Sequence, residues 1–269
     1  MKFEGEYQFG RIWNGKGYHK NGNIEFEIKD GKGYIKEYDD TYGKLRLRFE
    51  GEYFNGKRYG KGKEYYFDGR LLFEGDFLNG KRHGKGKEYN DNKIEFKGEY
   101  SNGKRNGKGK EYYNSGNLRF EGEYYNGRIW KGKGYNANGN IEFEIIDGKG
   151  YVKVYGFYTS LEFEGEYLDG KRNGKGKEYF DEKLNFEGDY LNGKKHGKGK
   201  EYYNYGKLKF EGEYYNGERN GKGKEYYYDG ELIFEGEYMN GKRWNGKGKE
   251  YNNDGVLSFS GEYLDGKRQ

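Results

Sequence analysis

Three histidines are the side chains of this sequence best suited to general acid-base catalysis or to metal binding. They are His19, His83 and His196, and the last two occupy a turn position that other parts of the chain fill with Asn106 or Asn173. We therefore interpret them as exposed turn residues. The chain has no cysteine, which removes thiolate nucleophiles and cysteine-bound zinc.

Carboxylate pairs could act in catalysis and Gly-Lys-Gly segments could bind phosphate, but both recur along the chain. Pairs such as Glu4 and Glu6 are found in almost every unit, whereas a catalytic pair needs one distinctive environment. Gly-Lys-Gly could hold a phosphate, yet no GxxxxGK[ST] motif occurs and no helix is expected to follow it. We therefore predict no catalytic residue, no cofactor, no metal site and no enzymatic activity.

Lysine and arginine doublets recur at one end of the predicted hairpins. Stacked hairpins would align these doublets in a basic stripe, which could bind anionic phospholipid or an acidic protein; the alternative is a plain solvated edge. The basic stripe comprises Lys57, Arg58, Lys81, Arg82, Lys104, Arg105, Lys171, Arg172, Lys194, Lys195, Lys242 and Arg243.

Three tryptophans stand at matching positions of the chain, at Trp13, Trp130 and Trp244. Exposed tryptophan is a typical anchor of protein interfaces. The alternative is that each indole caps a neighbouring hairpin. Both interpretations stay open from the sequence.

The elements that position these residues come from an internal repeat. The repeat is marked by Phe-Glu-Gly-Glu-Tyr or a close variant, which begins at Phe3, Phe49, Phe73, Phe96, Phe120, Phe163, Phe186, Phe210, Phe234 and Phe259. Two altered copies of this motif, at Phe26 and Phe143, bring the number of units to twelve, most of them 23 or 24 residues apart.

Each unit has the pattern of a β-hairpin. Leu118, Phe120, Gly122 and Tyr124 alternate with charged residues, as in a strand with one apolar face. Asn-Gly pairs such as Asn102-Gly103 are turn signals. Because two strands alone are marginally stable in water, the hairpins must stack. The sequence predicts an all-β fold, an elongated single-sheet solenoid of about twelve tandem antiparallel β-hairpins without helix.

A second level of repetition divides the chain. Residues 3–38 are nearly copied by residues 120–155. We expect one repeat array over residues 1–269, with block one at 3–119, block two at 120–233 and a partial third block at 234–269. In each block the second unit is abbreviated, and we expect a tight Asp-Gly turn to replace a longer loop there.

Composition sets the limits of the fold and of its partners. Only 31% of residues are hydrophobic and 36% are charged, but 33 tyrosines and 18 phenylalanines supply large rings that can be buried. Net charge is +5, from 51 basic and 46 acidic residues, so nucleic acid binding is unlikely. With no signal peptide pattern in the sequence, we expect an intracellular protein, cytoplasmic or associated with cytoskeleton or membrane.

The pattern F-E-G-E-Y-x-N-G-K-R-x-G-K-G-K-E-Y closely resembles the MORN repeat, and the preceding G-x-L-x-F is similar to the variant of bacterial YwqK-type proteins. The resemblance implies a twisted array of hairpins that serves for attachment or dimerisation. The usual tryptophan of the first strand is replaced here, for example by Tyr53, Phe77 and Tyr100.

These observations predict a non-catalytic structural or interaction scaffold. A single-layer sheet leaves one aromatic surface uncovered, and such surfaces usually find a partner. We expect a protein partner or self-association, as a dimer or end to end. The alternative is peripheral binding to an anionic phospholipid membrane through the basic stripe.

Overall fold

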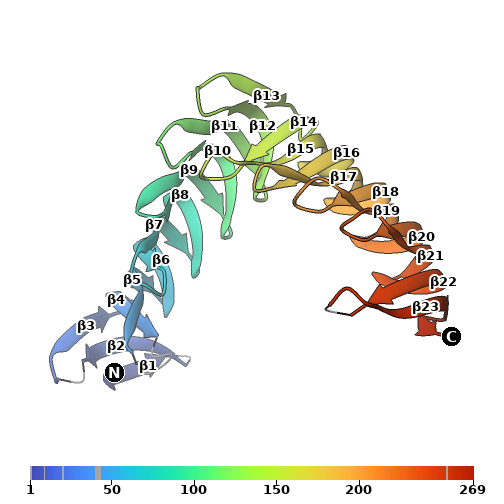
Figure 1. The fold of residues 1–269 in the computed structure, drawn as a ribbon. Coiled ribbons are helices and arrows are strands. Elements are labelled where there is room, and N and C mark those ends of the chain that lie inside the picture. The colour runs from blue at the N-terminus through green and yellow to red at the C-terminus, as the bar shows by residue number, and fades with distance from the viewer. Residues whose placement is uncertain (1, 9, 20, 40–43, 253) are drawn as a thin grey trace. The chain divides into compact units, whose positions relative to one another are not determined.

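The structure is a computed structural model that describes residues 2–8, 10–19, 21–39, 44–252 and 254–269, and within these ranges all regular structure is β (Figure 1). Twenty-four strands follow one another in chain order, and every strand is antiparallel to the next within its sheet. The predicted all-β fold of tandem hairpins is confirmed. None of the described residues forms a helix with the length and apolar character that a membrane crossing requires.

The first sheet has 13 strands. They are β1 (Lys2–Gln8), β2 (Arg11–Tyr18), β3 (Ile24–Lys29), β4 (Lys32–Asp39), β5 (Arg46–Phe54), β6 (Lys57–Tyr65), β7 (Leu71–Leu78), β8 (Lys81–Asn90), β9 (Lys93–Ser101), β10 (Lys104–Tyr112), β11 (Leu118–Tyr125), β12 (Arg128–Tyr135) and β13 (Ile141–Ile145).

The second sheet has 11 strands. They are β14 (Gly150–Tyr155), β15 (Leu161–Leu168), β16 (Lys171–Phe180), β17 (Lys183–Leu191), β18 (Lys194–Tyr202), β19 (Leu208–Tyr215), β20 (Glu218–Tyr226), β21 (Leu232–Met239), β22 (Lys242–Tyr251), β23 (Leu257–Leu264) and β24 (Lys267–Arg268).

The sheet that the sequence predicts as single is thus interrupted between β13 and β14. The hairpin formed by these two strands pairs only through the isolated bridge Ile146↔Lys149. Its counterpart in the first sheet is almost as short, because β3 and β4 pair only at Ile28↔Gly33 and Lys29↔Lys32. Among the hairpins inside the array, the abbreviated ones therefore have the fewest paired residues.

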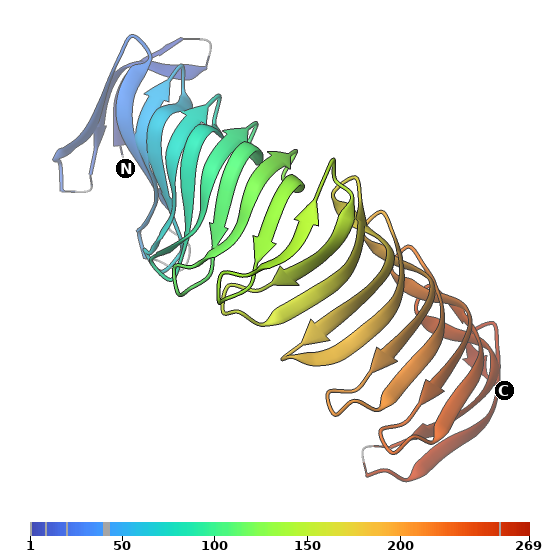
Figure 2. The ribbon, with the colours of Figure 1, turned by 90° about the horizontal axis from the view of Figure 1, so that it is seen from above.

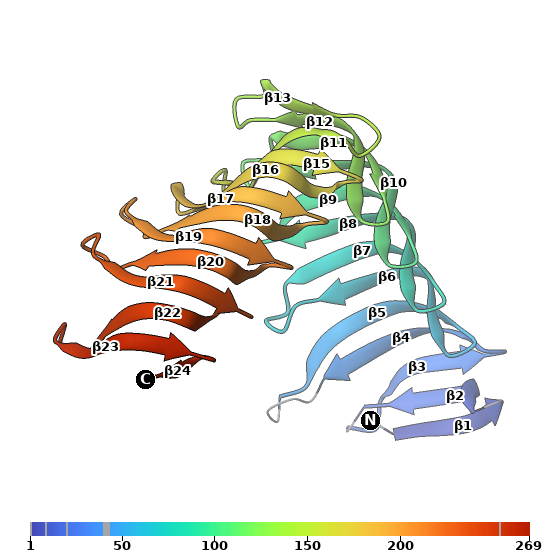
Figure 3. The same cartoon turned by 90° about the vertical axis from the view of Figure 1, so that its right-hand side faces the viewer.

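The chain forms two compact units, Met1–Gly139 and Asn140–Gln269. Their division falls after Gly139, inside block two of the sequence repeat. Within each unit, consecutive strands lie side by side in chain order (Figures 2 and 3). Contacts within a unit are therefore made mostly between neighbouring hairpins.

A typical hairpin, β9 and β10, combines a two-residue turn with a bulge. Asn102 and Gly103 have φ angles of 51° and 84°, the left-handed pair that a type I′ turn requires. Arg105 pairs with Tyr100, but the next pair is Gly109 with Gly98, so β10 carries extra residues in between. This bulge bends the strand just before the Gly-Lys-Gly segment.

The abbreviated hairpins differ from the regular ones in a way that the sequence interpretation placed wrongly. Asp30-Gly31 forms a two-residue turn, with φ angles of 51° and 70°, like the turns of the regular hairpins. Beyond the turn, Ile28 pairs with Gly33 just as Tyr100 pairs with Arg105, so the missing residues are those of the bulge that follows Arg105. A shorter strand, and not a shorter turn, explains the smaller unit.

One face of the sheet holds the core, and we call it the aromatic face. Phe73 and Phe96 are fully buried, with 0% exposure, and Tyr100 lies at 3%. The Tyr100 ring packs edge-on against both phenylalanines, with centroid distances of 5.2 and 5.6 Å. The motif phenylalanines from Phe49 to Phe234 are buried in this way under rings of their own or the next repeat, so the predicted uncovered aromatic surface is not found over them.

Paired glycines make room for these rings. A Cβ on Gly98 would lie 2.5 Å from the Phe96 Cζ and 2.7 Å from the Gly109 Cα. The two strands could not approach each other so closely beneath the ring with any larger residue. The glycine of Phe-Glu-Gly-Glu-Tyr and the second glycine of Gly-Lys-Gly therefore belong to the core.

Candidate functional site

The arginines of the basic stripe form the outer layer of the aromatic face. The Arg105 guanidinium lies 4.1 Å from the centroid of the Phe96 ring, a cation-π contact that also shields the ring from water. Arg105 pairs with Glu111 at 2.6 Å and with Glu88 of the preceding hairpin. Its side chain is only 21% exposed.

The same arrangement repeats through the first unit. Arg82 pairs with Glu64 at 2.7 Å and with Glu88 at 3.2 Å, so Glu88 is held between two arginines. The Tyr100 hydroxyl also donates to Glu88, at 2.8 Å. Burial alone would raise the pKa of Glu88, but Arg105, the Tyr100 hydroxyl and Arg82 together hold it below its ordinary value.

These contacts divide the basic stripe into two kinds of side chain. The second member of each doublet is half-buried over a ring; in the second unit Lys195 takes this place, 4.0 Å from the Phe186 ring and 3.1 Å from Glu178. The first members are exposed or half-exposed. These are Lys57, Lys81, Lys104, Lys171, Lys194 and Lys242.

The tryptophans are half-buried. A Cβ on Gly31 would lie 2.9 Å from the Trp13 ring, and one on Gly266 would lie 3.3 Å from the Trp244 ring. Both indoles therefore cover the turn glycine of the following hairpin. Trp130 packs against Tyr125, with a centroid distance of 5.6 Å. Their role as interface anchors stays a prediction.

The residues with catalytic potential are dispersed. His19 is exposed, and His83 and His196 are half-exposed on strands of different units. Among the described residues, no group of three or more histidine, cysteine, aspartate or glutamate side chains could hold a metal ion.

The repeated carboxylates have separate structural tasks. The Glu99 carboxylate accepts a hydrogen bond from the backbone N–H of Lys108 at 3.0 Å, which fixes the bulge. Glu74, the first glutamate of its motif, accepts hydrogen bonds from the Lys87 ammonium at 2.8 Å and from the Tyr89 hydroxyl at 2.6 Å. These hydrogen bonds lower the pKa of Glu74. In a recurring carboxylate pair, the first carboxylate thus binds side chains of the neighbouring strand, and the second holds the backbone of the bulge.

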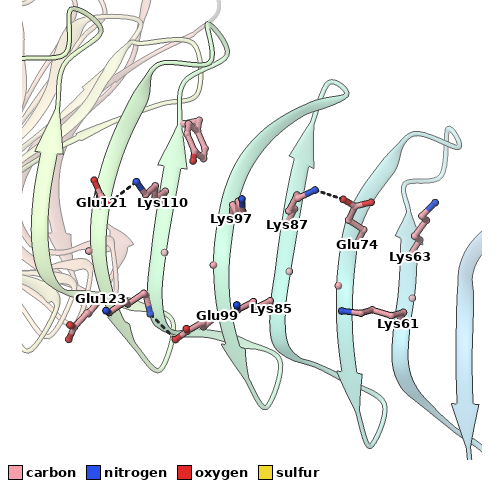
Figure 4. Close-up of a pocket in the computed structure, with 18 of the residues that line it drawn as sticks. Lys61, Lys63, Glu74, Lys85, Lys87, Lys97, Glu99, Lys110, Glu121 and Glu123 are labelled. Atoms are coloured by element: carbon pink, nitrogen blue, oxygen red, sulfur yellow. Dashed lines mark hydrogen bonds and ion pairs between the residues drawn. The ribbon is translucent and has the colours of Figure 1, made fainter.

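The opposite face of the sheet, the charged face, is hollowed into a groove over β6–β11 of the first unit (Figure 4). The groove has a volume of 1020 Å³. Two rows of charged side chains border a strip of glycine backbone. The lining residues are Tyr34, Lys61, Gly62, Lys63, Glu74, Gly75, Lys85, Gly86, Lys87, Lys97, Gly98, Glu99, Lys108, Gly109, Lys110, Tyr112, Glu121, Gly122 and Glu123.

Charge alternates along the upper row of this groove except at Lys97. This position is glutamate in the other motif copies, apart from Ser260. Lys97 pairs in register with Lys87 on one side and with Lys110 on the other. We call Lys87, Lys97 and Lys110 the lysine triad.

The outer members of the triad have carboxylate partners beyond it. Lys87 pairs with Glu74 at 2.8 Å and Lys110 with Glu121 at 2.7 Å, as the dashed lines in Figure 4 mark. Lys97 is exposed and faces a lysine on both neighbouring strands. Directly opposed like charges destabilise a sheet, so the triad is a local excess of positive charge.

A second groove, of 550 Å³, lies on the charged face of the second unit and is lined by four lysines and four glutamates. There Glu211 takes the place that Lys97 has in block one, between Lys200 and Lys224. The Tyr226 hydroxyl donates to Glu211 at 2.8 Å. The first groove instead has seven lysines against four glutamates, so the two grooves differ in charge.

Comparison with known families agrees with this geometry. Residues 49–69, 73–93, 96–118, 163–182, 186–206 and 210–231 match the MORN repeat family. The chain contains six MORN repeats. MORN repeats are generally involved in protein or membrane interactions. The six matched repeats cover hairpins of both units, and the groove of the first unit lies over three of them.

The solved structures similar to this chain include two of TcdB2-TccC3, one without its hypervariable C-terminal region and one described as TcdB2-TccC3-TEV. They are 10% identical to the chain, cover 95% and 93% of it, and give TM-scores of 0.23 and 0.19. The chain spans 16% and 15% of their length. A likeness this low carries no argument. A comparison with curated proteins gives no match.

Sequence reasoning missed the groove and the lysine triad. Lys97 could have been found by aligning the MORN repeats with one another, because it reverses the charge of a recurring glutamate. The engagement of the doublet arginines could not have been found in this way. Their spacing is the same whether they point to solvent or fold back over a ring.

Proposed function

We propose that this protein is a non-catalytic interaction scaffold that binds a protein partner in the groove of its first unit. The observation that supports the proposal most directly is the 1020 Å³ groove on the charged face. Its volume is at the upper end of the range for ligand sites. Apart from Tyr34 on β4, its lining comes from the six consecutive strands β6–β11 of repeat sequence, so the scaffold itself forms the binding surface.

The division of labour between the two faces also supports this proposal. The aromatic face forms the core, through ring contacts and arginine-glutamate pairs such as Arg105 with Glu88. The charged face carries lysines and glutamates that do not cover an apolar layer, and it is therefore free to meet a partner.

Membrane attachment through the basic stripe has weaker support. Arg58, Arg82 and Arg105 are 24%, 21% and 21% exposed and engaged with glutamates. Only the lysine members of the doublets would meet a lipid surface, each adding about 1 kcal/mol at most. We therefore propose binding of a protein partner, and not membrane attachment, as the function.

Lysine footprinting of the full-length chain tests this function. The protein is isolated with its partners from its native source, and complexes of defined stoichiometry are selected by native mass spectrometry. Acetylation of lysines is then compared between the complex and the free chain. We expect protection of the groove residues Lys61, Lys85 and Lys108, and unchanged reactivity of the edge residues Lys57 and Lys81.

Light scattering of the purified chain separates self-association from binding to another protein. A chain that stays monomeric at about 100 µM and yields no stoichiometric complex would contradict the scaffold function. Protection of Lys57 and Lys81 in place of the groove lysines would move the binding surface to the basic stripe.

A further inference from the structure

We infer that the groove of the first unit binds an extended acidic peptide segment, and that the lysine triad selects two carboxylates placed two residues apart. This inference rests on the proposed function and adds the chemistry of the partner. It concerns Lys87, Lys97 and Lys110, which lie in register on β8, β9 and β10.

The charge of the triad requires an anion from outside the chain. Each of the other lysines in the row meets a carboxylate on a neighbouring strand, such as Lys87 with Glu74. Lys97 meets a lysine on both sides, although a glutamate at this position would complete the alternating pattern. A bound carboxylate between these lysines would supply the missing negative charge.

A tyrosine hydroxyl completes the site. In neighbouring repeats this hydroxyl donates to the first glutamate of the motif, as Tyr89 does to Glu74 at 2.6 Å. Tyr112 is the corresponding residue beside Lys97, and lysine offers no acceptor. Tyr112 also lines the groove, so its hydroxyl can donate to a carboxylate of the partner.

The spacing of the strands fixes the form of the ligand. Neighbouring strands are about 4.8 Å apart, so the triad spans roughly 10 Å across three strands. Alternate side chains of an extended peptide are about 6.6 Å apart and point to the same side. The two gaps between the three lysines lie about 4.8 Å apart, so the two flexible glutamate side chains converge slightly to place one carboxylate in each gap. The six strands of the groove span about 24 Å, enough for roughly seven extended residues.

Fluorescence anisotropy of the full-length chain measures this binding. The probe is a fluorescein-labelled peptide, Thr-Glu-Thr-Glu-Thr, and its control carries glutamine in place of both glutamates. We expect the acidic probe to bind at 20 mM NaCl, to weaken as salt rises, and to exceed the glutamine control at least tenfold in affinity.

Two charge variants of equal net change localise the binding. K97E restores the glutamate of the other repeats, and we expect it to weaken probe binding at least tenfold. K57E makes the same change of charge at the exposed edge of the array, and we expect less than a twofold effect. The midpoint of urea unfolding should not fall in K97E, because the new carboxylate meets two lysines and Tyr112.

The second unit offers a gain-of-function test. E211K creates a triad with Lys200 and Lys224 next to Tyr226, in a groove of balanced charge. We expect the stoichiometry of the acidic probe to rise from one to two per chain. Equal losses in K97E and K57E would overturn the inference, as would equal binding of the glutamine control or no binding at low salt.

Lipid is tested in the same variants with vesicles containing phosphatidylserine. Vesicle binding that K97E abolishes, in a protein that does not bind the peptide, would assign the triad to a headgroup and overturn the peptide inference. If the acidic probe fails but footprinting still protects Lys61, Lys85 and Lys108 in a complex, the scaffold function stands and only the ligand chemistry is wrong.

Discussion

At the scale of single residues, guanidinium groups cover the buried rings, as aliphatic side chains do in a conventional core. Arg105 covers Phe96 at 4.1 Å and is held there by Glu88 and Glu111. A planar guanidinium can stack on a ring and bind two carboxylates at once. The chain thereby buries phenylalanine in a single layer although 36% of its residues are charged.

Removal of one guanidinium therefore tests the core. We expect Arg105→Ala to lower the free energy of unfolding by about 2 kcal/mol, because Phe96 loses its cover and two half-buried glutamates lose their cation. Arg105→Lys should cost about half as much, since Lys195 shows that a lysine can stack in this place. Urea unfolding provides the measurement. Lys104→Ala, at an exposed neighbour, is the control and should change stability by less than about 0.5 kcal/mol.

The ionisation of Glu88 makes the stability of the folded state depend on pH. Its folded pKa lies below the ordinary value of 4.5, so the folded state binds the proton more weakly than the unfolded state. The stabilisation is fully present above pH 4.5 and is lost as pH falls through the folded pKa. We expect urea midpoints to fall as the pH decreases below 4.5. In Glu88→Gln the acid dependence should be shallower, and an unchanged slope would contradict this role.

The residue types of the aromatic face were predictable, and their layering was not. Phe96, Gly98 and Tyr100 follow the two-residue period of a strand, which places them on one face from the sequence alone. Whether Arg105 points to solvent or back over Phe96 depends on the bulge between Arg105 and Gly109. Bulge geometry has no counterpart in a simple alternation pattern, so the stripe was predicted without the burial of its arginines.

At the scale of the hairpin, the bulge and the glycine pair define the regular unit. A bulge shifts the register between Arg105 and Gly109, and the pair Gly98 and Gly109 lets two strands meet under a ring. The abbreviated hairpins lack the bulge and have shorter ladders. The turns were predicted correctly, because Asn-Gly and Asp-Gly favour positive φ at both positions.

Glycine replacement on the strand tests the close approach of β9 and β10. We expect Gly98→Ala to lower the free energy of unfolding by about 2 kcal/mol or more, since its Cβ would meet Phe96 at 2.5 Å and backbone at 2.7 Å. Gly116→Asn is the control, because nothing lies within 4 Å of that Cβ, so this variant has only the backbone strain of a side chain at a φ of 89°, about 1 kcal/mol. Equal loss in both variants would contradict a packing role for Gly98.

At the scale of the molecule, all strand pairs with extensive contacts in the described chain are neighbours in sequence. Stability in such an array is a sum of hairpins and their interfaces, and disturbances stay near their origin. The repeat period predicted this organisation. The interruption after β13 was not predicted, because it results from the short ladder of an abbreviated hairpin.

Hydrogen exchange can show how far a disturbance spreads. Phe210 is fully buried in the second unit and contacts Tyr214 and Tyr238. We expect Phe210→Ala to cost about 3 kcal/mol locally and to reduce amide protection in β18–β21. Protection in β5–β10 should stay unchanged. Equal loss of protection along the whole chain would contradict an additive array.

The ion pairs that join neighbouring hairpins on the aromatic face run in one direction along the chain. Arg82 reaches back to Glu64, and Arg105 reaches back to Glu88, in each case a glutamate of the preceding hairpin. The ribosome delivers 23 or 24 residues in about 1 to 5 s, whereas a hairpin closes in about 1 to 10 µs. Each nascent hairpin can thus dock on the preceding hairpin and form these ion pairs during translation, before the following residues are synthesised.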